Sequence, residues 1–113
     1  MTHYYNLKKA PFEAIKRGEK VYELRLYDEK RKLLSVGDEI VFDCDDYEET
    51  LRVKVKKLHI FGSFEELYKA LPLEKCGYKK EELAAASYKD MEEYYPREKQ
   101  ENYGVVGIET ELI

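Results

Sequence analysis

Tryptophan is absent from this chain of 113 residues, cysteine occurs only twice and proline only three times. Cys44 and Cys76 lie far apart and form no Cys-x-x-Cys pair, so we expect neither a disulfide framework nor a structural zinc site. No metal and no cofactor are expected. Because cysteine is so scarce, a reducing cytoplasm is the expected compartment.

Long apolar runs are also missing. No stretch of about 18 apolar residues occurs, and the first residues lack the basic start and apolar stretch of a signal peptide. We therefore expect neither a membrane span nor secretion. The familiar catalytic and phosphate-binding signatures are absent too: there is no Gly-x-Gly-x-x-Gly, no phosphate loop, no Gly-x-Ser-x-Gly and no His-Glu-x-x-His. His3 and His59 have no neighbours arranged for a metal or a catalytic triad, and we expect each to be structural or merely exposed.

Charged residues are abundant, and the two signs are unevenly distributed along the chain. Charged residues make up 39% of the chain and the net charge is -4. That balance argues against a protein that coats nucleic acid by bulk electrostatics. Residues 1–35, however, carry nine Lys and Arg against five acids, which leaves the remainder at -8. This distribution fits a local anion-binding mouth, although ordinary solvated charge is the alternative.

The order of predicted elements favours one α+β domain over residues 1–113, since no repeat or linker interrupts the chain. Apolar alternation predicts strands over 2–7, 21–27, 39–43, 51–56 and 104–112. Helices are predicted over 11–17, 63–71 and 80–95, the first ending at Gly18, the second beginning with a capping box at Ser63, and the third closing before Pro96. Hairpin-length connections favour a mixed or antiparallel barrel-like sheet over a doubly wound parallel sheet.

The richest chemistry lies between Gly18 and Arg25. On a strand, Glu23 and Arg25 project from the same face, and Lys20 at the strand entrance can reach over the same opening. A guanidinium beside a carboxylate offers donors and an acceptor together, which suits a nucleobase edge or a phosphate next to a base. The alternative is a surface ladder of salt bridges, which contributes little energy.

These residues carry a family resemblance. Gly18-x-Lys20-x-x-Glu23-x-Arg25, followed by Val36-Gly37-Asp38, resembles the ASCH domain of the PUA-like superfamily. Tyr94-Tyr95-Pro96 and Tyr103-Gly104-Val105-Val106 resemble the end of small single-domain ASCH proteins of bacteria or archaea, so the similarity spans about residues 4–112. It implies a PUA-like β-barrel with flanking helices, a cleft bordered by the Lys/Glu/Arg strand and the helical region, and a role in binding RNA or another nucleic acid.

The resemblance also implies a possible activity. Some small bacterial ASCH proteins are amidohydrolases that remove acetyl from N4-acetylcytidine with a lysine, a threonine and a glutamate. Lys20 falls on the lysine position and Glu23 on the threonine position, and the nearest counterparts of the glutamate are Glu81 or Glu82. In an enzyme, Lys20, Glu23 and Arg25 are the expected catalytic residues.

We expect first a binding module for RNA, a nucleotide or a modified nucleoside. Its expected ligand-binding residues are the charged Lys20, Glu23 and Arg25, the basic rim of Lys16 and Arg17, and the stacking candidates Tyr22, Tyr95 and Tyr103. The alternatives are an amidohydrolase acting on N4-acetylcytidine or a related acylated nucleoside, and a protein-interaction or regulatory module. Burial separates them: a buried, solvent-connected triad supports a cleft, whereas a fully exposed pair does not.

Overall fold

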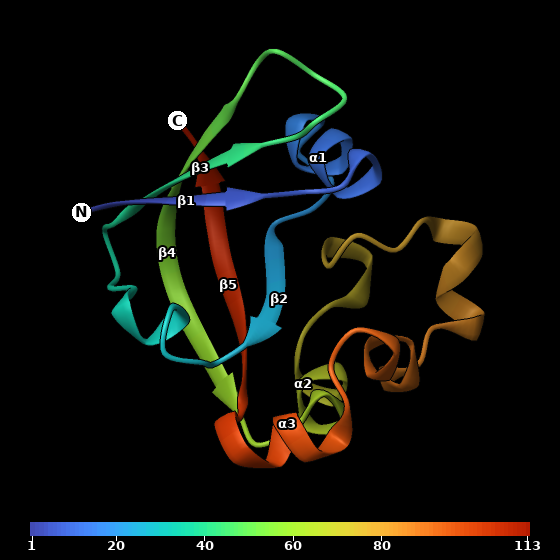
Figure 1. Ribbon diagram of the computed structural model, residues 1–113. Helices are drawn as coiled ribbons and strands as arrows, with labels where there is room; N and C mark the ends of the chain where they lie inside the picture. Colours follow the sequence, from blue (N-terminus) through green and yellow to red (C-terminus); the bar gives the residue numbers. More distant parts are fainter.

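Five strands form one curled sheet, a half-barrel, in the order β1-β3-β4-β5-β2 (Figure 1). The computed structural model describes residues 1–113, with strands β1 (Thr2–Asn6), β2 (Tyr22–Leu26), β3 (Glu39–Asp43), β4 (Leu51–Phe61) and β5 (Val105–Leu112). β1 pairs with β3 in parallel, and all other pairings are antiparallel. The predicted α+β class with a mixed sheet is confirmed. β1 and β2 are the two edge strands of the sheet.

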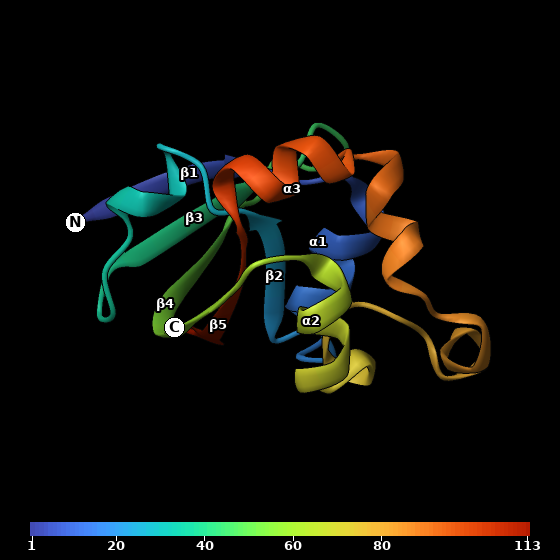
Figure 2. The same ribbon diagram turned by 90° about the horizontal axis from the view of Figure 1, so that it is seen from below.

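The helices lie around the end of the sheet and beside β2. They are α1 (Lys9–Lys16), α2 (Phe64–Ala70) and α3 (Arg97–Tyr103). Between α2 and α3 runs a stretch that we call the 3-10 segment, made of the short helices Leu73–Lys75, Lys80–Ala85 and Tyr88–Glu93. Figures 1 and 2 show this segment beyond β2, on the side of α1 and α2. None of the helices has the length and apolar character needed to cross a membrane.

Two apolar clusters hold the sheet. The larger one fills the inside of the curl and includes the fully buried Phe12, Phe42 and Ile108. The smaller one joins Leu24 and Leu26 of β2 to the apolar residues of α2. Because side chains alternate along a strand, Glu23 and Arg25 lie on the opposite face of β2 from Leu24 and Leu26, which is the inside of the curl. Glu23 and Arg25 therefore point toward the larger cluster.

Local signals explain most of these elements. Ser63 caps α2 as predicted, its hydroxyl accepting a hydrogen bond from the backbone N–H of Glu66 at 3.3 Å. After α1, Gly18 adopts φ +77°, a left-handed conformation that glycine takes without steric cost. β3 and β4, which are consecutive in the chain, pair in antiparallel fashion as a hairpin. β4 extends to Phe61 instead of ending near residue 56, and its pairing with β5 continues through a register shift between Val55 and Lys57.

The predicted helix over 80–95 is wrong. Its apolar spacing is helical, but Ala86 is extended at ψ +133° and divides the stretch into two short 3-10 helices. Ser87 starts the second one: its hydroxyl accepts from the N–H of Lys89, while Asp90 accepts from the N–H of Ser87. Such side-chain bonds compete with a continuous helix. The sequence prediction also missed α3, where Pro96 stands at the N-cap of a new helix.

Gly107 of β5 sets how closely α2 approaches the sheet. A Cβ atom at this position would lie 2.6 Å from Leu71 Cδ1 and 3.6 Å from Leu67 Cδ1. We expect Gly107→Val to lower the free energy of unfolding by about 2 kcal/mol through overpacking, as measured by urea denaturation. Glu111→Val, on the exposed end of the same strand, is the control and should change stability little. Equal stability of the two variants would contradict this account of the packing.

Candidate functional site

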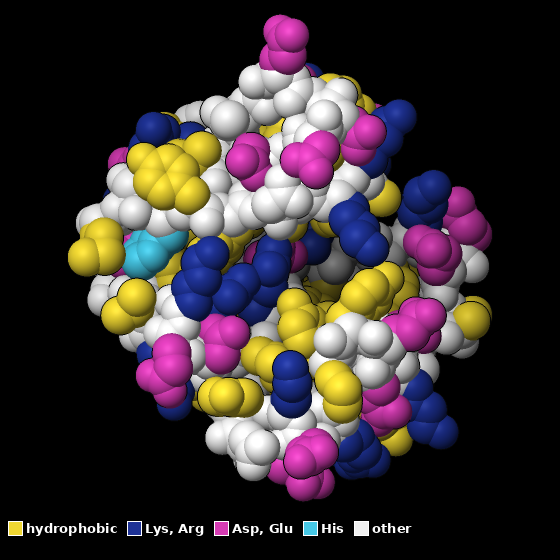
Figure 3. All heavy atoms as spheres, in the orientation of Figure 1, with side chains coloured by type: hydrophobic (Ala, Val, Ile, Leu, Met, Phe, Trp, Pro, Cys, Tyr) yellow, Lys and Arg dark blue, Asp and Glu magenta, His cyan; other side chains and the backbone are white.

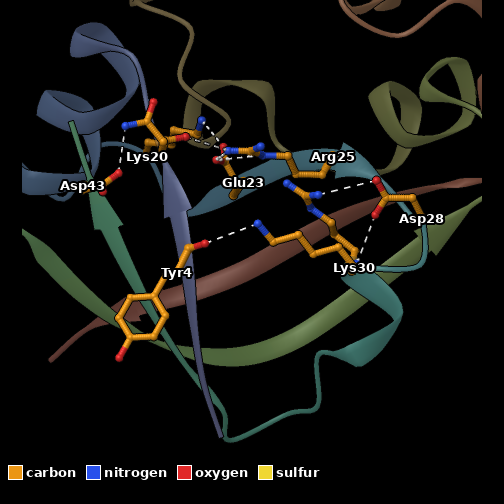
Figure 4. A network of polar contacts seen from close by, with 9 residues as sticks. Tyr4, Lys20, Glu23, Arg25, Asp28, Lys30 and Asp43 are labelled. Atoms are coloured by element: carbon orange, nitrogen blue, oxygen red, sulfur yellow. Dashed lines mark hydrogen bonds and ion pairs between the residues drawn. The ribbon is translucent and has the colours of Figure 1, made fainter. Parts of the chain in front are cut away.

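The three charged residues of the β2 region meet at one buried carboxylate. Lys20 Nζ donates to Glu23 Oε1 at 2.7 Å, and the Arg25 guanidinium donates to Glu23 Oε2 at 3.0 Å and 3.3 Å. Figure 4 shows Lys20 and Arg25 approaching Glu23 from opposite sides. Only 5% of the Glu23 side chain is exposed, against 9% for Lys20 and 19% for Arg25. This arrangement is not a surface ladder of salt bridges.

Backbone geometry around two turns brings Lys20 to this position. The N–H of Lys20 donates to the carbonyl of Ala14 at 3.1 Å, so the turn after α1 folds the chain back onto the helix. The next residue, Val21, donates to the carbonyl of Lys75 at 2.8 Å and ties β2 to the 3-10 segment. Gly77, at φ +107°, lies against the lysine stem, where a Cβ atom would be 3.3 Å from Lys20 Cδ. The lysine is thus enclosed by backbone on both sides.

The electrostatics of the triad favour the ionised carboxylate. Burial acts to raise the pKa of Glu23, but the charges and hydrogen bonds of Lys20 and Arg25 outweigh it and hold this pKa below its usual value. For Arg25, burial acts to lower the pKa, and the Glu23 carboxylate raises it overall. Glu23 is therefore an acceptor without a proton to give at neutral pH. It can orient cations or accept from a ligand.

A groove runs along the free edge of β2, over the triad. It consists of two adjoining cavities of about 300 and 390 Å³, which share Pro11, Leu24, Met91 and Tyr94. Lys20 lines the first cavity, and Glu23 and Arg25 line the second. Figure 3 looks onto this face, where the surface is hollowed near its centre and Lys and Arg side chains gather beside the hollow. The triad is buried yet borders solvent-accessible space.

The groove has two chemically different ends. At one end the second cavity carries the cations Lys8 and Arg25, and Lys8 Nζ lies 5.5 Å from the centre of the Tyr94 ring. At the other end the first cavity carries the acids Glu82 and Asp90. A ligand with a phosphate at one end and hydrogen-bond donors at the other would match this polarity.

Two tyrosine hydroxyls extend the hydrogen-bond network from the acidic end of the groove into the groove wall. Tyr78 donates to Asp90 Oδ2 at 2.7 Å, and the hydroxyls of Tyr68 and Tyr78 are 2.7 Å apart. Burial raises the pKa of Tyr68 to about 12, although the bond to Tyr78 acts to lower it. Burial likewise raises the pKa of Tyr78. Both phenols are neutral hydrogen-bonding groups.

The residues expected from sequence to bind a ligand separate into those in the groove and those outside it. Tyr95 lines the second cavity together with Glu23 and Arg25. Tyr22 instead packs edge-on against His59, and Tyr103 lies at the end of α3, where it lines none of these cavities. Lys16 is exposed and pairs with Glu49 at 2.6 Å. These last three residues are not brought to the triad.

Of the remaining charged candidates, Glu82 lies in the groove, and Arg17 and Glu81 lie outside it. Arg17 pairs with Glu19 and lines the neighbouring, strongly charged depressions instead of the groove. Of the two glutamates considered for catalysis, Glu82 lines the same cavity as Lys20, whereas Glu81 lines one of those depressions. Glu82 also accepts from the N–H of Lys79 at 2.7 Å. The structure therefore distinguishes the two glutamates by position.

No group of three or more His, Cys, Asp or Glu side chains is placed to hold a metal ion. Cys44 and Cys76 are both free and buried. Cys76 lines the groove, but burial raises the pKa of its thiol to about 12, despite the opposing charge of Lys20. The thiol is protonated at neutral pH and hence a poor nucleophile.

Sequence reasoning did not select four side chains of the groove wall: Tyr78, Asp90, Met91 and Tyr94. The 3-10 segment brings them to β2, and nothing in the local pattern of these residues indicates that distant contact. Tyr94 had one usable signal, because it belongs to the Tyr94-Tyr95-Pro96 motif. Its ring, 61% exposed, is more accessible than that of the neighbour chosen from sequence.

Comparisons with known proteins agree with the fold. The sequence model of the ASCH domain family matches residues 6–113. The crystal structure of the hypothetical protein PH0355 is similar over the full length of both chains, with 36% identity and a TM-score of 0.82. The solution structure of PF0455 from Pyrococcus furiosus has 34% identity and a TM-score of 0.71, covering 100% of this chain and 98% of that one. None of the curated proteins compared with the chain matches it.

The buried triad generates a prediction about stability. Glu23→Gln leaves two cations beside a neutral amide, so we expect the free energy of unfolding at neutral pH to fall by about 3 kcal/mol. Because the folded-state pKa of Glu23 lies below its ordinary value of 4.5, the contribution of the carboxylate is complete above that pH and disappears as the pH falls through the folded value. The stability gap between wild type and variant should therefore shrink on acidification.

Urea denaturation at about pH 7 and about pH 3 measures this gap. Glu111→Gln is the control, since Glu111 is exposed and pairs with Lys56 at 3.2 Å on the surface. A gap for Glu23→Gln that is as small as that of the control, or that does not change with pH, would contradict the role assigned to the buried carboxylate.

Proposed function

Because the chain belongs to the ASCH domain family, we propose that it binds single-stranded RNA by taking one nucleotide into the groove beside β2. The resemblance implies RNA as the ligand, and the cytoplasm is the compartment we assign to this function. The observation that carries the proposal is the groove itself: an ion triad is buried at its floor, yet the cavities above it are open to solvent. Burying three charges gains little stability, because the cost of desolvation offsets their attraction. Beside an open cavity, a role in ligand binding is the better explanation of such a group.

The dimensions and the basic end suit a nucleotide. Each cavity falls at the lower end of the range of about 300–1,000 Å³ that is usual for small-ligand sites. Lys8 and Arg25 supply positive charge for a phosphate. Tyr94 offers a ring face for base stacking, a form of recognition that is common for unpaired RNA. The net charge of -4 is consistent with recognition of one or a few nucleotides instead of long duplex.

The acidic end suits the amino group of a base. Asp90 Oδ2 already accepts from Tyr78 and from the N–H of Ser87, while Asp90 Oδ1 accepts no hydrogen bond from the protein. An exocyclic amine of cytosine, adenine or guanine can donate to such an oxygen, whereas uracil has no amine to offer. Binding in this orientation places the phosphate near Arg25 and the base near Asp90.

We expect Tyr94→Ala to weaken binding of short single-stranded RNA about tenfold, the loss typical for one stacking aromatic. The measurement is fluorescence anisotropy with labelled hexanucleotides of cytidine, adenosine and uridine. The cytidine and adenosine probes should bind more tightly than the uridine probe, because only their bases carry an amine.

Tyr103→Ala is the matched control, since Tyr103 is also exposed but lines neither cavity. Its affinity for RNA should equal that of the wild type. Equal losses in the two tyrosine variants, or the absence of binding to any hexanucleotide by the wild type, would refute the proposal.

A second candidate is amide hydrolysis of N4-acetylcytidine, and one observation favours it: Glu82 and Lys20 line the same cavity, as an acid and an amine of such an enzyme would. The chemistry at Glu23 weighs against it. This residue stands where the resembling hydrolases have threonine, and an ionised carboxylate donates no hydrogen bond to an oxyanion. Lys20 is already held by that carboxylate at 2.7 Å.

We therefore expect no release of cytidine when the purified protein is incubated with N4-acetylcytidine, followed by chromatography. Release that is lost in Glu82→Gln but retained in Glu81→Gln would establish the hydrolase instead. The pair is well matched, because Glu81 and Glu82 are both exposed and adjacent, and only Glu82 reaches the groove with Lys20. Lys20→Ala should abolish any such release as well.

A further inference from the structure

Three cations surround one buried ring where the open edges of the sheet approach each other. We call Arg25, Lys30 and Arg31 the cation cluster. Their charged groups lie 5.5, 4.8 and 4.7 Å from the centre of the Tyr5 ring. Tyr5 belongs to β1 and is 2% exposed, so the three cations pack against a buried ring. None of this was evident in the sequence, because Tyr5 is far from the other three residues.

The cluster spans the gap between β1 and β2, which are the two edges of the sheet. Arg25 donates to the carbonyl of Asn6 and Lys30 to the carbonyl of Tyr4, each at 3.4 Å. Figure 4 shows Lys30 reaching toward Tyr4. At 3.4 Å both bonds are long, and the bond to Tyr4 is the one hydrogen bond of Lys30, so this ammonium keeps most of its donor capacity for a ligand.

Carboxylates near the cluster do not balance its charge. Arg25 shares Glu23 with Lys20, and Arg31 pairs with Asp28 at 3.5 Å. Lys30 makes no ion pair within 4.0 Å. Including Lys20, this region holds four cations and two carboxylates. Such an excess is notable in a chain whose net charge is -4.

Unsatisfied polar atoms coincide with the same cluster. The structure has two buried side-chain polar atoms without a hydrogen-bond partner, and they are Tyr5 Oη and Arg31 Nε. A buried donor left unpaired costs about 1–3 kcal/mol. Burial raises the pKa of Tyr5, although Arg31 and Arg25 act to lower it, so the phenol is neutral and cancels none of the positive charge. Two missing partners and an uncancelled charge at one place indicate an anionic ligand.

We infer that the cation cluster binds a backbone phosphate of the RNA strand, next to the nucleotide held in the groove. The inference rests on the proposed function and extends it from one nucleotide to a strand. Arg25 joins the two sites, since its side chain lines the groove and also contacts Tyr5. Lys30 and Arg31 continue the basic surface beyond it. The strand leaves the groove at its basic end and passes over the gap between β1 and β2.

A purely structural role explains these observations less well. A single cation could bridge the two strand edges. Glu23 and Asp28 offset part of the repulsion among the three cations, but Lys30 adds a positive charge that no carboxylate of the chain pairs with. Lys30 is exposed and its one hydrogen bond is long, so it contributes little to closing the gap. Its position is better explained by contact with a ligand.

Lys30→Gln tests the inference, because this substitution removes a charge without breaking an ion pair. Anisotropy titrations with the cytidine hexanucleotide are repeated over a range of salt concentrations. We expect an affinity about fivefold lower than that of the wild type, and a slope of log K against log salt that is smaller by about 0.7, the value for one phosphate contact with a single strand. Binding of uncharged cytidine should not change. Lys54→Gln, an exposed lysine on β4, is the control.

The outcomes separate the two proposals. If the wild type binds no hexanucleotide, the proposed function fails and this inference fails with it. If the wild type binds but Lys30→Gln keeps the wild-type affinity and slope, only the inference fails. Inorganic phosphate is added as a competitor at the concentration of the RNA. Displacement as effective as that by unlabelled hexanucleotide would show a site for free phosphate and overturn the assignment to a strand.

Discussion

The buried carboxylate of Glu23 is the interaction on which the rest of the site depends. It holds Lys20 and Arg25 at hydrogen-bonding distance from opposite sides, and it does so on a strand whose other face is packed against α2. Replacing such an ion group by apolar residues of similar volume is often neutral or stabilising. In the proposed function, its burial beside an open groove fixes the positions of two cations before a ligand binds.

The triad, the groove and the cation cluster form one continuous charged surface next to β2. Arg25 belongs at once to the triad, to the wall of the groove and to the cation cluster around Tyr5. The groove becomes acidic toward Asp90, and the gap between β1 and β2 stays basic toward Lys30. In the proposed complex, a nucleotide has its base at the acidic end and its phosphate at the basic end. The distribution of charge would thus set the orientation of the proposed ligand in the groove.

Sequence predicts the parts of this account that depend on local pattern. Alternation places Glu23 and Arg25 on one face, and the capping residue Ser63 marks the start of α2. It fails where contacts are distant or where side chains compete with the backbone, as Ser87 does within the 3-10 segment. The burial of Glu23 also follows from packing that no local pattern contains, and so does the meeting of Tyr5 with the cations of a later loop.

Binding of RNA in the groove beside β2 can be tested by mapping amide chemical shifts of the labelled protein during titration with the cytidine hexanucleotide. We expect perturbations along both sides of the groove, at residues such as Lys8, Lys20, Arg25, Met91 and Tyr94, which come from separate parts of the chain. Perturbations confined to the outer face of β4, or none at saturating RNA, would contradict it.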